Sequence, residues 1–483
     1  MKKSEKVFVC AVIMFAAIAT VFFGIRRLDY HVDEVWTFGL ANHVSGGEPD
    51  IEFGKKYTGW GFYGEFVKVL ENERFDYVNL WQNQAEDVHP PLYYVFIHTI
   101  CSLFPNTFSM WYGIAVNLMW MIPIVIVLYK LSKSITGDIK QAMGIVIVYC
   151  SSVGFFDTMI FIRMYAQFTF FAIALAYLLK IYWDKNHGRK FYIYFSVLLI
   201  FGMLTHYYFL IYTFAVCAAY GIHLILEKRY VELRKSILVA LGDGFFYILI
   251  WYHILGHLFR GYRGKQALQS ALSFGGVING IVGMFSQMDS ELFGGLLIIF
   301  IIFAVLLMFL KVKSKTICYS YKTALTISTI FYICLVGKIA PYLSFRYIMP
   351  VAFALEIIVC CVLYRLFGLI KWNIKSVYVV TLLLVLINIV SFVRCGFYIP
   401  KDNYSQKKKD LLASVDGADC IVYIEQNWEA LNYFQALQDA NSYIFIDEDT
   451  KDILNQIDED YILVTTNDYK DKFSEYSDQM VVF

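Results

Sequence analysis

Two acidic residues and two arginines occupy positions that would suit chemistry on a phosphate-bearing substrate. Asp33 and Glu34 follow the first apolar segment of the chain, whereas Arg163 and Arg346 lie at turns between later apolar segments. A carboxylate can take the proton from an incoming hydroxyl group. An arginine guanidinium can bind phosphate oxygens through two parallel hydrogen bonds. Together, these residue types favour a reaction between a hydroxyl group and a phosphate-linked group.

Histidines, tyrosines and one further acid accompany these four residues. The additional candidates are Asp87, His89, Tyr93, Tyr94, Tyr165, His206, Tyr207 and Tyr347. Each candidate also has an ordinary interpretation: Asp33 as a helix cap, the arginines as side chains that reach toward lipid headgroups, the tyrosines as interfacial residues and His206 as a structural residue. Their joint location on one predicted membrane surface favours a functional site.

The composition is typical of a polytopic membrane protein. Of the 483 residues, 59% are hydrophobic and 17% are charged, against roughly 45–50% and about 25% in soluble chains. These values exclude a single water-soluble globule, a disordered chain and a secreted disulfide scaffold. The ten cysteines form no CxxC pair, which argues against a metal cluster. The acidic segment after residue 400 argues against nucleic acid as a partner.

Eleven apolar segments are predicted to span the membrane. They cover residues 7–25, 108–129, 141–157, 164–181, 191–205, 207–226, 236–257, 291–310, 323–339, 347–367 and 376–395. The shorter apolar stretch 92–104 fits an interfacial helix better than a span. With eleven spans, the six most basic loops all fall on one side, which should be cytoplasmic. We therefore expect a cell-membrane protein with a cytoplasmic N-terminus and with residues 26–105, 257–290 and the C-terminal tail outside.

The tail alternates between short apolar runs and helical patterns. Strands are predicted at residues 421–424, 443–446, 461–464 and 480–483, with helices at 427–439, 450–457 and 468–476. This alternation predicts a small parallel α/β layer. We therefore expect two domains: an all-α transmembrane domain at residues 1–398 and an acidic extracytoplasmic α/β domain at residues 399–483. A cap or docking role suits the second domain.

The order of these motifs resembles the GT-C superfamily of membrane glycosyltransferases. The similar group is that of protein O-mannosyltransferases and aminoarabinose transferases, including bacterial members of glycosyltransferase family 39. The matching pieces are Asp33-Glu34, His89-Pro90-Pro91-Leu92-Tyr93-Tyr94, Arg163 with Tyr165, Thr205-His206-Tyr207, and Arg346-Tyr347 with Pro350, within residues 5–395. The resemblance implies a helical bundle with interfacial helices in its first external loop.

The resemblance also implies roles for the candidate residues. Asp33, with Glu34 as its neighbour, would act as the general base in an inverting transfer of a sugar from a polyprenyl-phosphate donor to an acceptor hydroxyl. Arg163, Arg346, His206 and Tyr347 would bind the donor phosphate. The sugar and acceptor pocket would be shaped by Asp87, His89, Tyr93, Tyr94, Tyr165 and Tyr207. The acceptor class stays open among cell-envelope glycan, lipid and protein.

Cofactor use and two other functions also stay open. No metal is assigned, although Asp157 could form a divalent metal site with Asp87 or Asp289. A glycan polymerase or ligase would share external acids and arginines. A lipid or glycan transporter would instead place charged residues within its spans. Asp243 and Glu356 are the main examples of such residues here.

Overall fold

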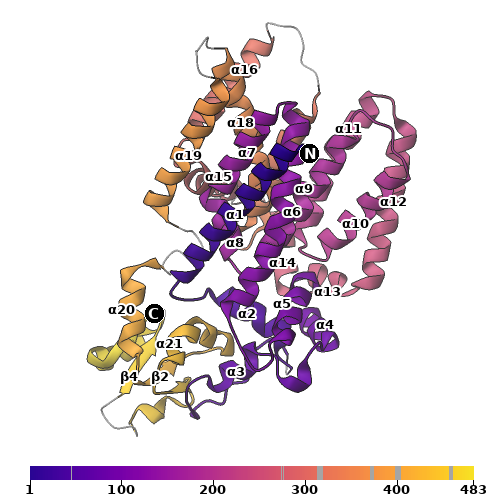
Figure 1. Ribbon diagram of the computed structural model, residues 1–483. Helices are drawn as coiled ribbons and strands as arrows, with labels where there is room; N and C mark the ends of the chain where they lie inside the picture. Colours follow the sequence, from indigo (N-terminus) through magenta and orange to yellow (C-terminus); the bar gives the residue numbers. More distant parts are fainter. Residues whose placement is uncertain are drawn as a thin grey trace.

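The computed structural model describes residues 1–44, 46–273, 275, 277–312, 319–369, 375–396, 404–455 and 461–483. Most of these residues form a bundle of long helices, and a small sheet lies at one end of the bundle (Figure 1). The predicted fold class, a polytopic helical bundle with a small C-terminal α/β domain, is confirmed. The predicted domain boundary at 398/399 lies outside the described residues.

Six helical segments among the described residues are long and apolar enough to cross a membrane, or up to nine if three bent helix pairs each count as one span. Their helices are α1 (Lys3–Ile25), α6 (Met110–Thr136), α11 (Tyr208–Leu226), α17 (Tyr321–Ile339), α18 (Ala352–Gly368) and α19 (Ser376–Cys395). The bent pairs are α7–α8 (Ile139–Cys150, Val153–Ile160), α12–α13 (Tyr230–Ile250, His253–Phe259) and α15–α16 (Val277–Phe293, Leu297–Val312), with bends of 59°, 96° and 92°. The chain is therefore a multi-pass membrane protein.

Two of the eleven predicted spans form helices that are not among these six to nine candidate spans of the described residues. They are α9 (Tyr165–Ile181) and α10 (Arg189–Met203). Helix α9 begins only at Tyr165 because residues 161–164 form the turn that carries Arg163. Large apolar side chains such as Val7, Met14 and Ile18 on α1 are exposed, as expected for a surface that faces lipid.

The segment between α1 and α6 forms short elements at one end of the bundle. These are α2 (Val32–Asn42), β1 (Lys56–Tyr57), α3 (Gly61–Val67), the 3-10 helix η1 (Glu71–Glu73), α4 (Tyr77–Glu86) and α5 (Leu92–Leu103). Helix α5 is the predicted short apolar helix, and Pro91 is its N-cap residue. Helices α13 and α14 (Tyr262–Leu272) lie at the same end, whereas the N-terminus of α1 lies at the other (Figure 1).

The C-terminal domain contains the predicted parallel sheet. Helix α20 (Gln406–Val415) precedes strands β2 (Asp419–Tyr423), β3 (Ser442–Ile446), β4 (Tyr461–Thr465) and β5 (Met480–Val482). Strand β2 pairs in parallel with β3 and β4, and β4 pairs in parallel with β5. The predicted helices are mostly 3-10: η5 (Asn427–Tyr433), η6 (Lys451–Asn455) and η7 (Lys470–Gln479), with α21 (Phe434–Gln438) after η5.

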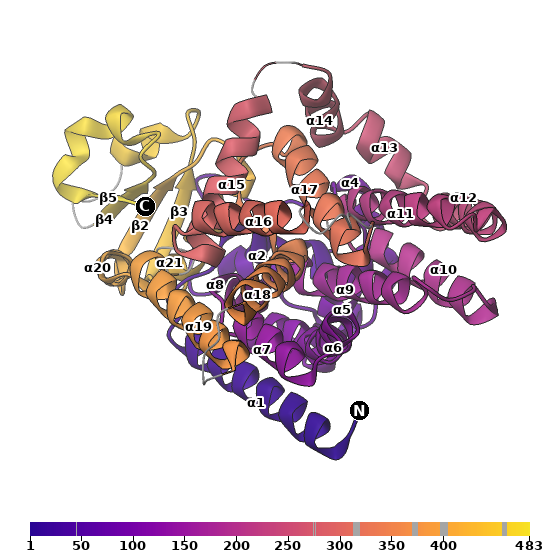
Figure 2. The same ribbon diagram turned by 90° about the horizontal axis from the view of Figure 1, so that it is seen from above.

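The C-terminal domain and the first loop share one sheet and one core. Strand β1 adds antiparallel to β3, so that Lys56 pairs with Ile444 and Tyr57 with Tyr443. A single cluster of buried apolar side chains continues from α2, α3 and α5 into the C-terminal domain. Figure 2 shows the sheet beside the bundle. The two predicted external regions therefore form one unit at the end of the bundle.

Candidate active site

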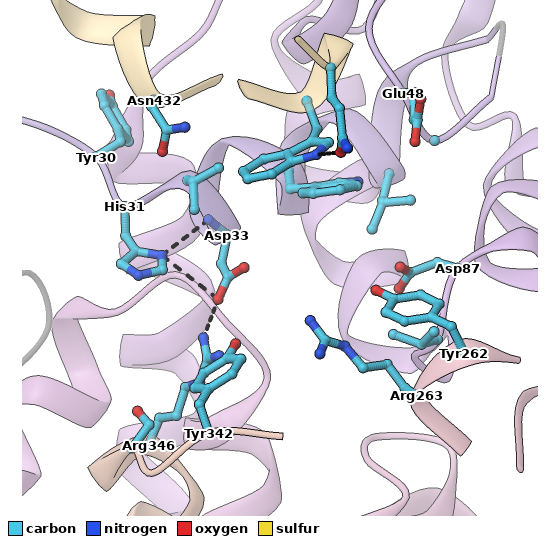
Figure 3. A pocket seen from close by; sticks show the side chains of 18 of the residues that line it. Tyr30, His31, Asp33, Glu48, Asp87, Tyr262, Arg263, Tyr342, Arg346 and Asn432 are labelled. Carbon is cyan, nitrogen blue, oxygen red and sulfur yellow. Dashed lines mark hydrogen bonds and ion pairs between the residues drawn. The ribbon is translucent and has the colours of Figure 1, made fainter. Parts of the chain in front are cut away.

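A cavity of about 1250 Å³ opens between the end of the bundle, the first loop and the C-terminal domain. A smaller chamber of about 200 Å³ adjoins it toward the bundle. Asp33, Trp36, Asp87 and Arg346 line both spaces, so these residues mark where the two spaces meet. Figure 3 shows Asp33 and Arg346 across the larger cavity from Asp87, Tyr262 and Arg263.

Asp33 lies in the first turn of α2, and its carboxylate is available to the cavity. His31 is the N-cap residue, because its Nδ1 accepts a hydrogen bond from the Asp33 backbone N–H at 3.1 Å. The interpretation of Asp33 as the helix cap is therefore wrong. The Asp33 carboxylate instead forms an ion pair with Arg346 (Figure 3), and about a fifth of the Asp33 side chain is exposed.

Glu34 points away from the cavity into the protein. Its carboxylate accepts hydrogen bonds from both terminal nitrogens of Arg27, and from the backbone N–H groups of His31 and Ile162 at 2.7 and 2.8 Å. The side chains of Glu34 and Arg27 are almost completely buried. This arrangement joins the start of α2 to the turn before Arg163, and it leaves Glu34 out of the lining of both spaces.

Arg163 is held in place by several neighbours. Its Nη1 donates to the Asp33 backbone carbonyl, Thr37 Oγ1 and Tyr94 Oη at 3.2, 3.0 and 3.2 Å. Its Nη2 lies 3.4 Å from His89 Nε2. Arg163 Nε is buried and has no hydrogen-bond partner among the described residues. The Nε–H donor of the guanidinium is therefore unsatisfied by the residues that this structure describes.

Asp87 fixes the orientation of His89. The Asp87 carboxylate lies 2.7 Å from His89 Nδ1, so the Nδ1–H group donates a hydrogen bond to Asp87. His89 Nε2 is then the acceptor that faces Arg163. Burial lowers the pKa of His89 more than the adjacent Asp87 carboxylate raises it, so the imidazole is neutral at pH 7. These contacts make Asp87 and His89 supports for Arg163, although both also line the smaller chamber.

Arg346 lies in the 3-10 helix η2 (Phe345–Tyr347), which precedes η3 (Met349–Val351) and α18. Its guanidinium stacks 4.6 Å from the ring centre of Tyr342 and 5.2 Å from that of Tyr347. Its Nε is buried and unpartnered within the described part of the chain. Arg346 and Arg163 therefore each present a buried positive charge with a spare donor near Asp33.

His206 lies at the turn between α10 and α11, and it lines the smaller chamber. Its Nδ1 accepts a hydrogen bond from the Tyr208 backbone N–H at 3.0 Å. Burial places the pKa of His206 well below its usual value, and positive charge from nearby Arg163 acts in the same direction. The neutral ring therefore carries its proton on Nε2, which makes this nitrogen a hydrogen-bond donor.

The predicted tyrosines occupy different places. Tyr165, Tyr207 and Tyr347 line the smaller chamber. Tyr93 is fully buried and donates to Asn117 Oδ1 at 3.0 Å, and Tyr94 is fully buried beneath Arg163. Tyr93 and Tyr94 line neither space, so direct contact with a sugar is excluded in this conformation. Successive buried positions of α5 face the first-loop core instead.

The electrostatics of the site keep Asp33 ionised. Burial alone would raise the pKa of Asp33, but the positive charges of Arg163 and Arg346 outweigh this effect and hold the pKa well below its usual range. Burial lowers the pKa of His31, and the same two positive charges act in this direction, despite the nearby Asp33 carboxylate. The resting site therefore holds the ionised carboxylate of Asp33 beside the guanidinium groups of Arg163 and Arg346, with neutral imidazoles at His31, His89 and His206.

The sequence interpretation missed several lining residues. Tyr262 and Arg263 of α14 line both spaces, and Lys408 of α20 forms an ion pair with Asp29 at 2.7 Å. Arg263 had a usable signal, because an arginine in a predicted external loop departs from the usual bias of basic residues toward the cytoplasm. No local pattern identifies Lys408, since its partner is 379 positions earlier.

The described residues contain no group of three His, Cys, Asp or Glu side chains arranged for a metal ion. Of the three aspartates considered for such a site, only Asp87 lines the cavity. Asp157 is fully buried in α8, and Asp289 Oδ1 accepts a hydrogen bond from the Leu297 backbone N–H at 2.8 Å.

The amino-acid sequence matches no protein-family profile and no curated protein. Among solved structures, the chain is similar to ArnT from Cupriavidus metallidurans bound to undecaprenyl phosphate, with a TM-score of 0.48 and 10% identity over 98% of this chain and 95% of that chain. It is also similar to ArnT from Cupriavidus metallidurans in the apo state, with a TM-score of 0.46 and 11% identity over 96% of this chain and 94% of that chain.

Proposed function

We propose that the protein is a membrane glycosyltransferase of the GT-C type. It would transfer a hexosyl or pentosyl group from a polyprenyl-phosphate-linked donor to an acceptor hydroxyl at the outer membrane face, with inversion. The observation that carries this proposal is the position of Asp33. Its carboxylate lies where a large open cavity meets a small chamber lined by Arg163, Arg346 and His206. This geometry suits a base between an acceptor and a phosphate.

The smaller chamber has the groups needed for the donor phosphate. Arg163 and Arg346 each retain a buried Nε–H donor without a partner in the described chain. His206 Nε2–H adds a neutral donor, as its Nδ1 bond to Tyr208 requires. Buried donors of this kind are costly unless they are paired, so an anion that satisfies them should bind well. Tyr165, Tyr207 and Tyr347 provide the aromatic and hydroxyl surface for the sugar.

The larger cavity would admit the acceptor. Asp33 would take the proton from the acceptor hydroxyl, whose oxygen then bonds to the anomeric carbon from the face opposite the phosphate. The bond from the anomeric carbon to the phosphate oxygen breaks, and its electron pair stays on that oxygen. Arg163 and Arg346 offset the charge that develops there. A lipid phosphate is a stable anion, so it needs no added proton to leave.

The ion pair between Asp33 and Arg346 links donor binding to base strength. In the resting site, Arg346 is a partner of Asp33 and makes it a weak base. A bound phosphate would share the charge of Arg346 and thereby raise the pKa of Asp33 toward its ordinary value. Glu34 would act as a positioning residue, because it joins the start of α2 to the turn that carries Arg163.

The arrangement favours a transferase over a transporter. Asp33, Arg163, His206 and Arg346 line one chamber, and they lie at the start of α2 or at turns between helices instead of along a path through the spans. Asp243 and Glu356, two of the acids within apolar helices, line neither space. A glycan polymerase or ligase would use the same external end, and only the product distinguishes it from an enzyme that transfers one sugar.

The decisive experiment measures release of free polyprenyl phosphate. Purified protein in detergent is incubated with a panel of polyprenyl-phosphate sugars and with membrane extract as a source of acceptor. Wild-type protein should release polyprenyl phosphate from at least one donor. Asp33→Asn should reduce the rate by at least about a hundredfold, which is typical for loss of a general base.

Asp50→Asn is the matched control, since Asp50 lies in the same loop, is 74% exposed and does not line the cavity. This variant should release polyprenyl phosphate at the wild-type rate. Substantial activity of Asp33→Asn would show that Asp33 is not the base. If no donor is consumed even with extract, the transport alternative gains support.

A further inference from the structure

The carboxyl ends of the parallel strands in the C-terminal domain face the larger cavity. Gln426 and Trp428 follow β2, Thr466 follows β4, and all three line the cavity together with Asn432 of η5. We refer to Gln426, Trp428, Asn432 and Thr466 as the C-terminal wall. Figure 3 shows Asn432 at the opposite rim of the cavity from Arg346.

The strand order makes this edge a binding crevice. The strand order is β1-β3-β2-β4-β5. The connection that leaves β2 therefore runs toward one edge of the sheet, to β3, and the connection that leaves β4 runs toward the other edge, to β5. Open parallel sheets bind ligands beyond the carboxyl ends of their strands, at the point where the direction of the connections reverses. That point lies between β2 and β4, and Gln426 and Thr466 flank it.

The C-terminal wall is polar but uncharged. Gln426 Oε1 accepts a hydrogen bond from Trp428 Nε1, so the amide NH₂ group of Gln426 is the part of this side chain that can donate to a ligand. Asn432 Nδ2 donates to the Glu429 carbonyl at 3.1 Å, which leaves its carbonyl oxygen as an acceptor. The wall therefore offers both donors and acceptors without a net charge.

The nearby acids of the C-terminal domain are engaged away from the cavity. Glu425 forms an ion pair with Lys472 at 2.6 Å, and Glu429 accepts hydrogen bonds from the Glu425 backbone N–H and from Tyr469 Oη at 2.8 and 2.9 Å. The side of the cavity formed by the first loop does carry carboxylates, at Glu48 and Glu86. Three cations also line the cavity, and two of them, Arg346 and Lys408, are paired with Asp33 and Asp29. The cavity therefore has five carboxylates against three cations. Carboxylates accept hydrogen bonds from hydroxyl groups and repel anions, so this lining favours a neutral ligand over an anionic one.

Trp428 connects this wall to the base. Its ring lies 6.4 Å from that of Trp36, and the two planes differ by 18°. Trp36 lines both spaces, and its buried Nε1–H has no partner among the residues described. An indole surface therefore leads from the C-terminal wall to the junction where Asp33 lies.

We propose that the C-terminal wall binds the acceptor and that this acceptor is a neutral saccharide. The C–H face of a sugar ring would pack against Trp428, its hydroxyls would bond to Gln426, Asn432 and Thr466, and a further hydroxyl would reach Asp33. The inference rests on the proposed function, because that function requires a hydroxyl-bearing acceptor in the larger cavity. It gives the C-terminal domain the role of selecting the acceptor.

An array of immobilised oligosaccharides and peptides tests this inference by binding alone, without a catalytic reaction. Full-length protein in detergent, carrying a fluorescent label, is applied to neutral oligosaccharides, anionic oligosaccharides and peptides. The variants are Trp428→Ala, Asn432→Ala and the control Asn467→Ala. Asn467 is exposed, adjoins Thr466 and does not line the cavity. The melting temperature of each variant is measured in the same detergent, so that misfolded protein is recognised.

Wild-type protein should bind a subset of the neutral oligosaccharides. Trp428→Ala should weaken that binding by roughly tenfold, the scale of one lost aromatic contact. Asn432→Ala should weaken it less, and Asn467→Ala should bind like wild type. Binding only to anionic glycans or peptides, no binding at all, or wild-type binding by both folded wall variants would overturn the inference. The array needs no donor, so a failure of polyprenyl phosphate release would refute the proposed function separately.

Discussion

The walls of the two adjoining spaces differ in charge and in origin: one belongs to the smaller chamber and the other to the larger cavity. The bundle wall consists of Arg163, His206 and Arg346, which lie at turns between apolar helices and are 5–6% exposed. The C-terminal wall consists of uncharged side chains that are only partly buried or exposed. Charge-assisted hydrogen bonds are about twice as strong as neutral ones. The stronger contacts therefore lie where we propose that the donor phosphate is held, and the weaker ones lie where we propose that the acceptor is selected.

The difference also concerns how firmly each side chain is held. Arg163 has four hydrogen-bonding neighbours. In addition, the buried ion pair of Arg27 and Glu34 lies between the start of α2 and the turn that carries Arg163, and Glu34 contacts both. Among the described residues, the Trp428 side chain makes one hydrogen bond, to Gln426, and one ring contact, with Trp36. Sites need rigid supports where geometry decides the rate. The bundle wall should therefore tolerate few substitutions, whereas the C-terminal wall should tolerate more.

The largest effect should come from the support of the bundle wall. Glu34→Ala leaves Arg27 as a buried charge without its carboxylate partner, and it removes the capping contact to His31. Breaking a buried ion pair in this way costs about 3–5 kcal/mol. We expect the free energy of unfolding to fall by about this amount in a denaturant titration in mixed micelles.

Glu52→Ala is the control for this substitution. Glu52 lies in the same loop, is 72% exposed and pairs with Lys55 at the surface. Its removal should change the free energy of unfolding by less than about 0.5 kcal/mol. Equal effects of the two substitutions would contradict the contrast between a supported bundle wall and an adaptable surface.

The next effect tests the phosphate site directly. Arg346→Ala removes one of the two guanidinium groups beside Asp33, and we expect kcat/KM for the donor to fall by about 10²–10³-fold. Arg346→Lys keeps the charge but lacks the Nε donor and the planar fork, so it should recover only part of this loss. Steady-state kinetics with varied donor measures both variants. Unchanged donor dependence in Arg346→Ala would remove Arg346 from the phosphate site.

Hydropathy predicted the helices well, because a helix in lipid needs a long apolar segment. The alternation of strand and helix patterns predicted the sheet of the tail, because parallel strands need a connecting segment between them. All eleven predicted apolar segments contain helix, and all four predicted tail strands are present. The two-residue strand β1 was not predicted, since its pairing with Ile444 and Tyr443 depends on residues almost 400 positions away. Bends such as that between α12 and α13 were also missed, because composition does not reveal them.

The candidate site was predicted by residue type but not by orientation. Successive residues in a helix point about 100° apart, so Asp33 faces the cavity while Glu34 faces the protein interior. The same geometry turns Tyr93 into the core of the first loop. The C-terminal wall carried no signal, because Gln, Asn and Thr are ordinary loop residues until the fold brings them to Asp33.

A smaller effect concerns the pH dependence of kcat/KM. Because Arg163 and Arg346 hold the pKa of Asp33 well below its usual range, the wild-type enzyme should show no acid limb from Asp33 near the ordinary value of about 4. Removing the charge in Arg346→Ala leaves more of the burial effect uncompensated, so the pKa must rise. Activity of the variant should then fall as the pH drops through that raised value. Parallel wild-type and variant profiles would exclude Arg346 as the group that tunes Asp33.

The smallest effect concerns the link between the two walls. Lys408 of α20 pairs with Asp29 at 2.7 Å, and their side chains are 18% and 5% exposed. A double-mutant cycle of Lys408→Met and Asp29→Asn should give a coupling free energy of about 1 kcal/mol, because the pair is only partly screened by solvent. The pair joins the segment before α2 to the helix that precedes β2, so its loss should affect acceptor use more than donor use. The coupling is measured from the free energies of unfolding of the four proteins, and a value near zero would show that the C-terminal domain is held by its shared core and sheet alone.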